Sequence, residues 1–335
     1  MLHQRRSGIR IASLSALFVS ALFFNAAHAE EAGVGFWLPG QYGSFAAVPY
    51  SQSGWSFEFV FYHAKASATA NAAFPRAGIP GVGVHSPSDL FMFTPTYVLE
   101  TPILGAQAAF GLSTLFGRNA TSVTATLTGP GGNTLSGVRS DDVVGIGDLA
   151  PQASLIWSRD VHNFMLYATG NIPVGAYSTT RLSALGLGYW AVDAGAGYTY
   201  YNEDAGVEWS AVLGFTYNFI NPHTRYQSGI SAHLDWAVSP YVSDTMHLGA
   251  VGYFYNQMTG DSGPGATLGD FKSRVAGIGP QIGFFFSVGE REAYLNFRGY
   301  QEFNAKNRLS GWTAWVTLSF EPPERKPSNA NTRKH

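Results

Sequence analysis

The chain has no cysteine and little charge, and both shortages restrict the class of fold. Only 13% of its 335 residues are charged, whereas an average soluble domain carries about 25% charge. Without cysteine, the fold does without disulfides. The net charge of −2 offers no basic surface of the kind that binds nucleic acid. Such a chain is expected to expose little surface to water.

Long hydrophobic runs are also missing beyond the N-terminus. A basic start is followed by an apolar run over residues 11–24 and by the small-residue site Ala27-His28-Ala29. This order predicts a signal peptide over residues 1–29. A membrane anchor is disfavoured because the run is short for about 30 Å of hydrocarbon. No later apolar run is long enough for a transmembrane helix.

What the sequence has in abundance is alternation. In VEWSAVLGFTYNF (207–219), every odd-numbered residue is apolar, and this period of two indicates a strand with one apolar face. Each such segment has about the length of a tilted membrane strand, and an even number of strands suits a closed barrel. Twelve segments follow the pattern: 55–65, 89–101, 106–117, 144–157, 163–173, 189–201, 207–219, 229–239, 245–257, 272–287, 293–304 and 311–320.

The connections between these segments alternate between long and short. Outer-membrane barrels have tight periplasmic turns and longer outer loops. The even-numbered connections have about five residues, whereas the odd-numbered ones are mostly long and rich in Gly, Ser, Thr and Pro: 66–88, 118–143, 174–188, 220–228, 258–271 and 305–310. We therefore predict an all-β fold, a closed antiparallel transmembrane β-barrel of about 12 strands located in the bacterial outer membrane.

Tryptophan placement supports a lipid-facing apolar surface. Amphipathic rings prefer the headgroup level of a membrane. Six tryptophans share the parity of the apolar face and fall near strand ends: Trp55, Trp157, Trp209 and Trp236 at the periplasmic end, and Trp190 and Trp312 at the outer end. The sequence thus predicts two aromatic girdles.

The chain divides into four parts. After the signal peptide, residues 30–54 lack clean alternation and form either a periplasmic lead-in or a segment packed inside the lumen. Residues 55–320 form the barrel, whose last strand ends at the aromatic Phe320. The polar residues 321–335 are predicted to be a disordered periplasmic tail.

Parity also predicts which side chains face the lumen. These residues either fill a narrow barrel as an internal network or line a permeation path. In the second case, a bulky residue at Gly214 or Gly249 would seal the path and reduce flux. The candidates are Glu58, Asp148, Asp193, Glu208, His233, Asp235, His247, Tyr253, Tyr255, Asn296, Arg298 and Glu302.

Motifs for catalysis or metal binding are weak. His233 and Asp235 could form a metal or acid–base site with Glu208 on the neighbouring strand, although such pairs more often serve structure. The stretch GDSG (260–263) resembles the nucleophile stretch of chymotrypsin-type proteases but lacks its His and Asp context. We predict no catalytic residue, no resident metal and no cofactor. Basic residues in the outer loops suit lipopolysaccharide phosphates.

Several stretches resemble one known family. They include FWLPGQYGS (36–44), TLTGPGG (126–132), GIGDLAPQASLIW (145–157), HNFMLYATGNIPVG (162–175), VDAGAGYTY (192–200), GFTYNFINPHTRYQSG (214–229), HLDW (233–236) and TGDSGPGATLGDFKSRVAGIGPQIG (259–283). The chain is similar to the MetA-pathway of phenol degradation outer-membrane proteins, including SphA-type transporter-like members. The resemblance implies a barrel that passes hydrophobic or aromatic compounds and brings no catalytic residues.

The expected function is therefore passive diffusion of small hydrophobic, aromatic or lipid-like compounds through a polar and aromatic lumen. One alternative is a structural or adhesive barrel without transport, and another is an outer-membrane enzyme that modifies lipids. The expected partners are outer-membrane lipid, lipopolysaccharide, the small hydrophobic solute and the barrel-assembly machinery during biogenesis. Nucleic acid is not an expected partner.

Overall fold

A computed structural model of the chain describes residues 35–69, 83–128, 134–267 and 269–323. The predicted signal peptide lies outside the described residues, as does the predicted tail from residue 324 onward. Within the described part, no helix is both long enough and apolar enough to cross a membrane.

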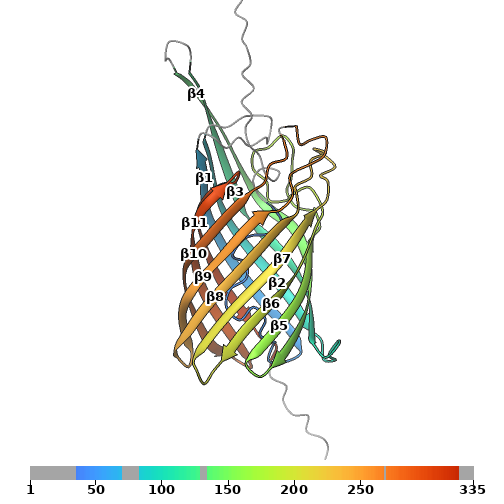
Figure 1. The fold of residues 1–335 in the computed structure, drawn as a ribbon, viewed down its shortest axis with the longest axis vertical. Helices are drawn as coiled ribbons and strands as arrows, with labels where there is room; N and C mark the ends of the chain where they lie inside the picture. Colours follow the sequence, from blue (N-terminus) through green and yellow to red (C-terminus); the bar gives the residue numbers. More distant parts are fainter. Residues whose placement is uncertain (1–34, 70–82, 129–133, 268, 324–335) are drawn as a thin grey trace, which may run out of the picture.

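The strands close into a single antiparallel barrel (Figure 1), which confirms the predicted fold class. Each strand pairs with the next along the chain, and β1 pairs with β12. Closure leaves no free sheet edge around the membrane-spanning wall, as lipid requires. The strands are β1 (Gly54–Thr69), β2 (Gly83–Val98), β3 (Gln107–Thr128), β4 (Thr134–Arg159), β5 (His162–Asn171), β6 (Ala191–Asn202), β7 (Val207–Asn218), β8 (Ser231–Ser243), β9 (Met246–Gln257), β10 (Arg274–Val288), β11 (Arg291–Lys306) and β12 (Ser310–Phe320).

The outward face of the barrel is a band of exposed apolar side chains. Phe91, Phe116 and Phe254 are each more than half exposed, at 58%, 53% and 54%. Such a continuous apolar surface marks contact with lipid rather than water. The apolar face of the alternating strands therefore points into the outer membrane.

Exposed tryptophans mark both ends of this band. Trp55 and Trp209 lie near the end with the short turns, and Trp190 and Trp312 lie near the end with the long loops. All four side chains are between 42% and 54% exposed. They form the aromatic girdles expected at the two membrane interfaces.

One predicted loop is a hairpin. We expected residues 118–143 to form an outer loop, but β3 and β4 stay paired from Phe116 and Ile146 up to Thr128 and Thr134. This hairpin rises above the rest of the barrel (Figure 1). The prediction was wrong because it ended the strands at the membrane boundary. Beyond it, the alternating β-branched stretch TSVTATLT (121–128) still favours strand in water.

A β-bulge interrupts the wall between β3 and β4. Thr114 pairs with Leu149 and Phe116 pairs with Ile146, so the single Leu115 faces both Gly147 and Asp148. The extra residue reverses the inward and outward parity of β4. As a result, Ile146 points outward at 61% exposure, whereas Asp148 is buried inside. A second irregularity, predicted because Arg274 falls on the lipid parity, occurs between Arg274 and Ala276.

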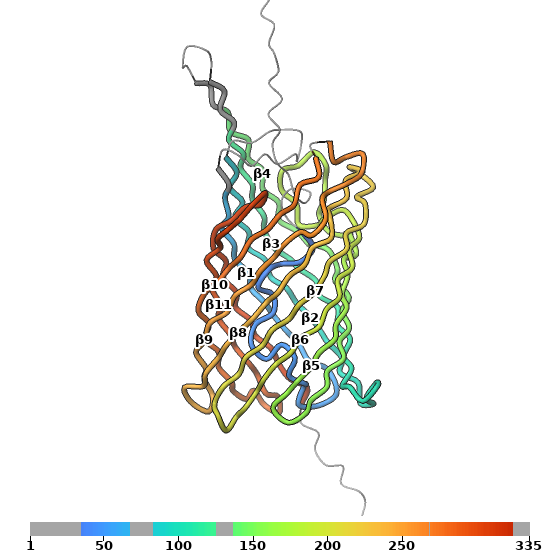
Figure 2. The backbone as a smooth tube through the Cα atoms, in the orientation of Figure 1, coloured from blue at the N-terminus to red at the C-terminus, as the bar shows by residue number. Residues whose placement is uncertain are grey.

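Residues 35–53, which we call the lumen segment, lie inside the barrel. Figure 2 shows this blue stretch of chain running within the cylinder before it enters β1. Trp37 is 2% exposed and Ala47 is fully buried, and both belong to the main buried cluster with side chains of the barrel wall. The lumen is therefore filled by the chain's own N-terminal part.

Candidate functional site

Two lumen carboxylates hold the backbone of the lumen segment. Asp235 of β8 accepts hydrogen bonds from the backbone N–H groups of Gly40 at 3.0 Å and Tyr42 at 3.1 Å, one on each oxygen. Glu208 of β7 accepts one from Phe45 at 2.9 Å. Hydrogen bonds to an ionised acceptor are among the stronger ones in proteins. These two predicted lumen residues thus bind the chain itself.

Further anchors continue down the segment. Thr199 Oγ1 accepts from the N–H of Ala47 at 3.0 Å. The Gln107 side chain accepts from the N–H of Tyr50 at 2.8 Å and donates to its carbonyl at 2.9 Å. Arg298 donates to the carbonyl of Gln41 at 3.2 Å. The segment is fixed by side chains from strands around the barrel.

The periplasmic end of the segment is tied to the residue that follows the last strand. Glu321 Oε2 accepts a hydrogen bond from the N–H of Ser51 at 3.2 Å. Burial raises the pKa of Glu321 to about 7, because the charged form loses hydration there. Protonation of this carboxyl group is therefore linked to how the segment ends.

A buried polar cluster lies beneath the outer end of the segment. Asp193 accepts hydrogen bonds from Tyr167 Oη at 2.7 Å and Thr216 Oγ1 at 2.6 Å, and its Oδ2 lies 2.9 Å from His233 Nε2. The Trp37 ring stacks on the His233 ring, with centroids 3.6 Å apart and planes 12° apart. The cluster forms a platform on which Trp37 rests.

The proposed grouping of His233, Asp235 and Glu208 is wrong. The register of β7 with β8 places Glu208 opposite Ser239, whereas His233 lies opposite Gly214. His233 meets Asp193 instead. Among the residues that the structure describes, no three His, Asp or Glu side chains lie together as metal ligands would. Periodicity gives the face of a residue but not its register with the next strand.

The other lumen candidates mostly contact one another. Tyr253 donates to Glu302 at 2.8 Å, and Tyr255 donates to Ser231 at 2.7 Å. His247 Nε2 lies 2.9 Å from Tyr294 Oη. The Asn296 side chain donates to Gln281 at 3.3 Å. Glu58 differs, because its position on β1 between the inward Ser56 and Val60 leaves it exposed within the lumen.

Gly214 and Gly249 do not border an open path. A Cβ at Gly214 would lie 2.0 Å from Tyr167 Oη, and one at Gly249 would lie 2.2 Å from the carbonyl oxygen of Val238. The prediction that bulk there would seal a path was wrong, because side chains and the lumen segment already fill those positions.

The outer loop 172–190, between β5 and β6, covers the mouth of the barrel. Asp148 accepts hydrogen bonds from the N–H groups of Gly175 and Leu187, both at 2.8 Å. Asp141 accepts from the N–H groups of Leu182 and Ser183, both at 3.0 Å. The loop is therefore fastened to β4 at two points.

The same loop reaches across to the opposite wall. Leu182 packs in a buried cluster with Val84 of β2, Val123 of β3 and Leu309 of the turn before β12. Arg181 pairs with Asp141 at 2.8 Å, and this hydrogen-bonded carboxylate raises the pKa of the Arg181 guanidinium above its usual value. The loop thus forms a lid over the lumen.

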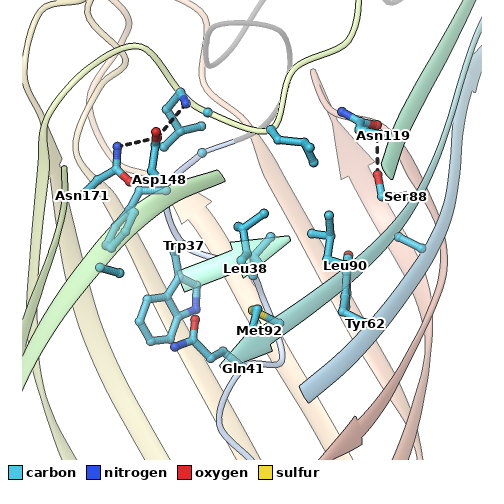
Figure 3. Close-up of a pocket in the computed structure, with 18 of the residues that line it drawn as sticks. Trp37, Leu38, Gln41, Tyr62, Ser88, Leu90, Met92, Asn119, Asp148 and Asn171 are labelled. Atoms are coloured by element: carbon cyan, nitrogen blue, oxygen red, sulfur yellow. Dashed lines mark hydrogen bonds between the residues drawn. The ribbon is translucent and has the colours of Figure 1, made fainter. Parts of the chain in front are cut away.

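Between this lid and the lumen segment lies a cavity of about 250 Å³. Figure 3 shows Trp37, Leu38 and Gln41 lying below it, with Leu90, Met92 and Tyr62 on the wall. Other lining residues come from the lid (Tyr177, Ala184, Leu185, Gly186 and Leu187), from β3 and β4 (Ser113, Thr114, Leu115, Asn119, Asp148, Ala150 and Gln152), and from the opposite side (Glu302, Arg308, Leu309 and Thr313).

The polar side chains of the cavity are largely paired with one another. Asp148 accepts from Asn171 at 2.9 Å, and Asn119 accepts from Ser88 at 3.0 Å, as the dashed lines in Figure 3 show. The Arg308 guanidinium lies 4.7 Å from the centre of the Tyr255 ring. A solute in the cavity therefore meets mainly apolar side chains, with polar groups at a few positions.

Sequence reasoning missed several residues that shape the site. Parity does not apply to Trp37 and Phe45, because the lumen segment has no strand period. Tyr167 faces the lumen on β5 by the same alternation that identified its neighbours, so parity could have found it. The lid carried no signal except its length.

Comparisons with known proteins agree with this architecture. The crystal structure of an outer membrane channel from Pseudomonas putida F1 superposes with a TM-score of 0.61 at 14% identity, covering 85% of this chain and 98% of that one. A Pseudomonas aeruginosa FadL homologue gives a TM-score of 0.39 at 10% identity, covering 88% and 98% of the two chains. The CymD monoaromatic hydrocarbon channel gives 0.41 at 9% identity, covering 90% and 99%.

No curated protein matches the sequence. A family model does match residues 64–318, nearly the whole barrel, and its description is "Putative MetA-pathway of phenol degradation". The predicted resemblance is thereby confirmed, and the chain belongs to this family.

Proposed function

We propose that the protein is an outer-membrane channel that admits small, mainly apolar compounds, single-ring aromatics among them, by passive diffusion. The observation that carries the proposal is the lumen cavity between the lid and the lumen segment. A passive path across the barrel requires both closures to move, because the lid covers the outer mouth and the segment fills the lumen below.

The size and lining of the cavity favour this class of solute. An apolar cavity of about 150 Å³ is large enough to bind benzene, and this cavity measures about 250 Å³. Leu90, Met92 and Leu115 supply apolar wall, and the ring of Trp37 supplies an aromatic surface. Binding pockets for small molecules commonly combine such a lining with few polar groups.

The names of similar structures agree with the proposal. One is an outer membrane channel and another a monoaromatic hydrocarbon channel. The family description refers to phenol degradation. These names concern other proteins, so they add support only beside the cavity.

Binding of 4-nitrophenol tests the proposal, because this compound is a single-ring aromatic that quenches tryptophan fluorescence. We expect saturable quenching in the wild type and loss of its saturable part in Trp37→Phe, since Trp37 lines the cavity. Leu185→Trp should fill the cavity and weaken binding at least about tenfold, the effect of about 1.4 kcal/mol.

Leu213→Trp is the matched control, because Leu213 faces lipid with 47% exposure. It should bind like the wild type. If Leu185→Trp and Leu213→Trp bind equally well, the cavity is not the binding site. An absence of saturable quenching in the wild type would instead favour the alternative, a structural or adhesive barrel without transport.

An enzymatic function is the less favoured alternative. The cavity is lined by Ser86, Ser88 and Ser113 but by no histidine. A serine nucleophile of the usual type needs an adjacent general base. We therefore propose a channel rather than a lipid-modifying enzyme.

A further inference from the structure

Near the periplasmic end of the lumen, five aromatic rings from five different strands surround one side chain. The surrounded residue is Phe45 of the lumen segment. The five rings, which we call the aromatic cage, are Tyr201 of β6, Tyr241 of β8, His247 of β9, Phe285 of β10 and Tyr294 of β11.

Phe45 contacts every ring of the cage in the same way. The centroid distances run from 5.4 Å to His247 and Phe285 up to 6.3 Å to Tyr241. All five interplanar angles lie between 68° and 86°. Edge-to-face contact of this kind is a favoured arrangement of aromatic pairs. The cage is thus complementary to a benzene ring rather than to an arbitrary apolar group.

The cage is also organised independently of Phe45. Tyr241 and Phe285 stack with planes 8° apart, and Phe285 lies 4.8 Å from Tyr294. His247 Nε2 is 2.9 Å from Tyr294 Oη. Because these residues stand on paired strands of the wall, the cage is expected to keep its form when the lumen segment moves.

The backbone at Phe45 is strained by this placement. Its φ is +64°, in the left-handed region that residues with a side chain rarely adopt. Apart from its ring contacts, Phe45 is held by the hydrogen bond of its N–H to Glu208. A ring that occupies the cage without this backbone strain has an advantage over Phe45.

From this geometry we propose that the aromatic cage is a second binding site for a single aromatic ring, which Phe45 occupies while the channel is closed. An aromatic solute that takes the place of Phe45 frees this part of the lumen segment. The solute thereby opens its own path. This inference rests on the proposed function, and the site lies apart from the cavity under the lid.

Crystals soaked in 4-bromophenol test the site directly, because anomalous scattering locates bromine. The variant is Phe45→Ala, which removes the benzyl group and leaves the cage vacant. The matched control is Phe59→Ala, which removes the same group from the lipid face, where Phe59 is 44% exposed. We expect bromine in the cage of Phe45→Ala and none there in Phe59→Ala.

Conductance in planar bilayers tests the competition. We expect phenol to raise the open probability of the wild type and of Phe59→Ala. Phe45→Ala should be open at least about tenfold more often without phenol, because it lacks several aromatic contacts, and phenol should not open it further.

Two results would overturn the inference. One is a folded Phe45→Ala whose cage holds no bromine at a soak that fills the cavity under the lid. The other is a wild-type conductance that phenol leaves unchanged although 4-nitrophenol binds under the lid. In both cases the proposed function would stand, because the upper cavity would still bind its solute.

Discussion

Asp235 offers the sharpest test of how the lumen segment is held. Its two carboxylate oxygens accept one backbone N–H each, from Gly40 and Tyr42. In Asp235→Asn only one oxygen remains, and the amide N–H₂ faces the second backbone N–H. The substitution keeps the shape of the side chain but removes one charge-assisted hydrogen bond and sets two donors against each other.

The expected size of the effect follows from these contacts. A hydrogen bond to a charged group contributes about 1.5–3 kcal/mol. We therefore expect the bound segment to be destabilised by about 2 kcal/mol, which corresponds to a roughly 30-fold greater population of the released segment.

The absence of cysteine makes the assay simple. A single Ala46→Cys substitution places the only thiol of the protein in the segment, and a water-soluble maleimide reports each release. Labelling should be about 30-fold faster when Asp235→Asn is added. Asp204→Asn, in the exposed turn between β6 and β7, is the control and should leave the rate unchanged. Equal labelling rates in all three folded proteins would refute the role assigned to Asp235.

Three further predictions concern the periplasmic end, the lid and the lumen packing. The native state holds the proton of Glu321 more tightly than the unfolded chain, with a pKa of about 7 against 4.5. Stability is then highest below about pH 4.5 and falls as the pH rises to about 7, and thermal unfolding from pH 4 to 8 should show a flatter slope in Glu321→Gln. Asp141→Ala removes the acceptor of two lid N–H groups and of Arg181. It should speed 4-nitrophenol binding several-fold in stopped-flow fluorescence, because the lid opens more often. Gly214→Val overpacks the lumen and should cost about 1–3 kcal/mol in unfolding free energy, whereas Gly137→Val, at an open position, should cost little.

The sequence specifies the barrel well, because alternation is a local property that each strand carries by itself. Residues 207–219 alone show which face is apolar, and the predicted strand over them differs from β7 by one residue. The same parity places Asp193, His233 and Asp235 inside, where the structure has them buried.

The arrangement of the site depends on information that alternation lacks. The meeting of His233 with Asp193 depends on the registers of β6, β7 and β8 together. The bulge at Gly147 and Asp148 depends on the packing of the wall near Leu115. The lumen segment binds through its backbone N–H groups, which every sequence has, so its anchors at Asp235 and Glu208 leave no pattern in residues 35–53.

The most direct test of the proposed channel is the flux of 4-nitrophenol into vesicles whose outer leaflet is lipopolysaccharide, a barrier that this compound crosses slowly on its own. Wild-type protein should speed entry, Asp235→Asn should speed it further, and Leu185→Trp should bring it back toward the protein-free rate. If entry is the same with the folded wild-type protein and without it, the barrel is not a channel for such compounds.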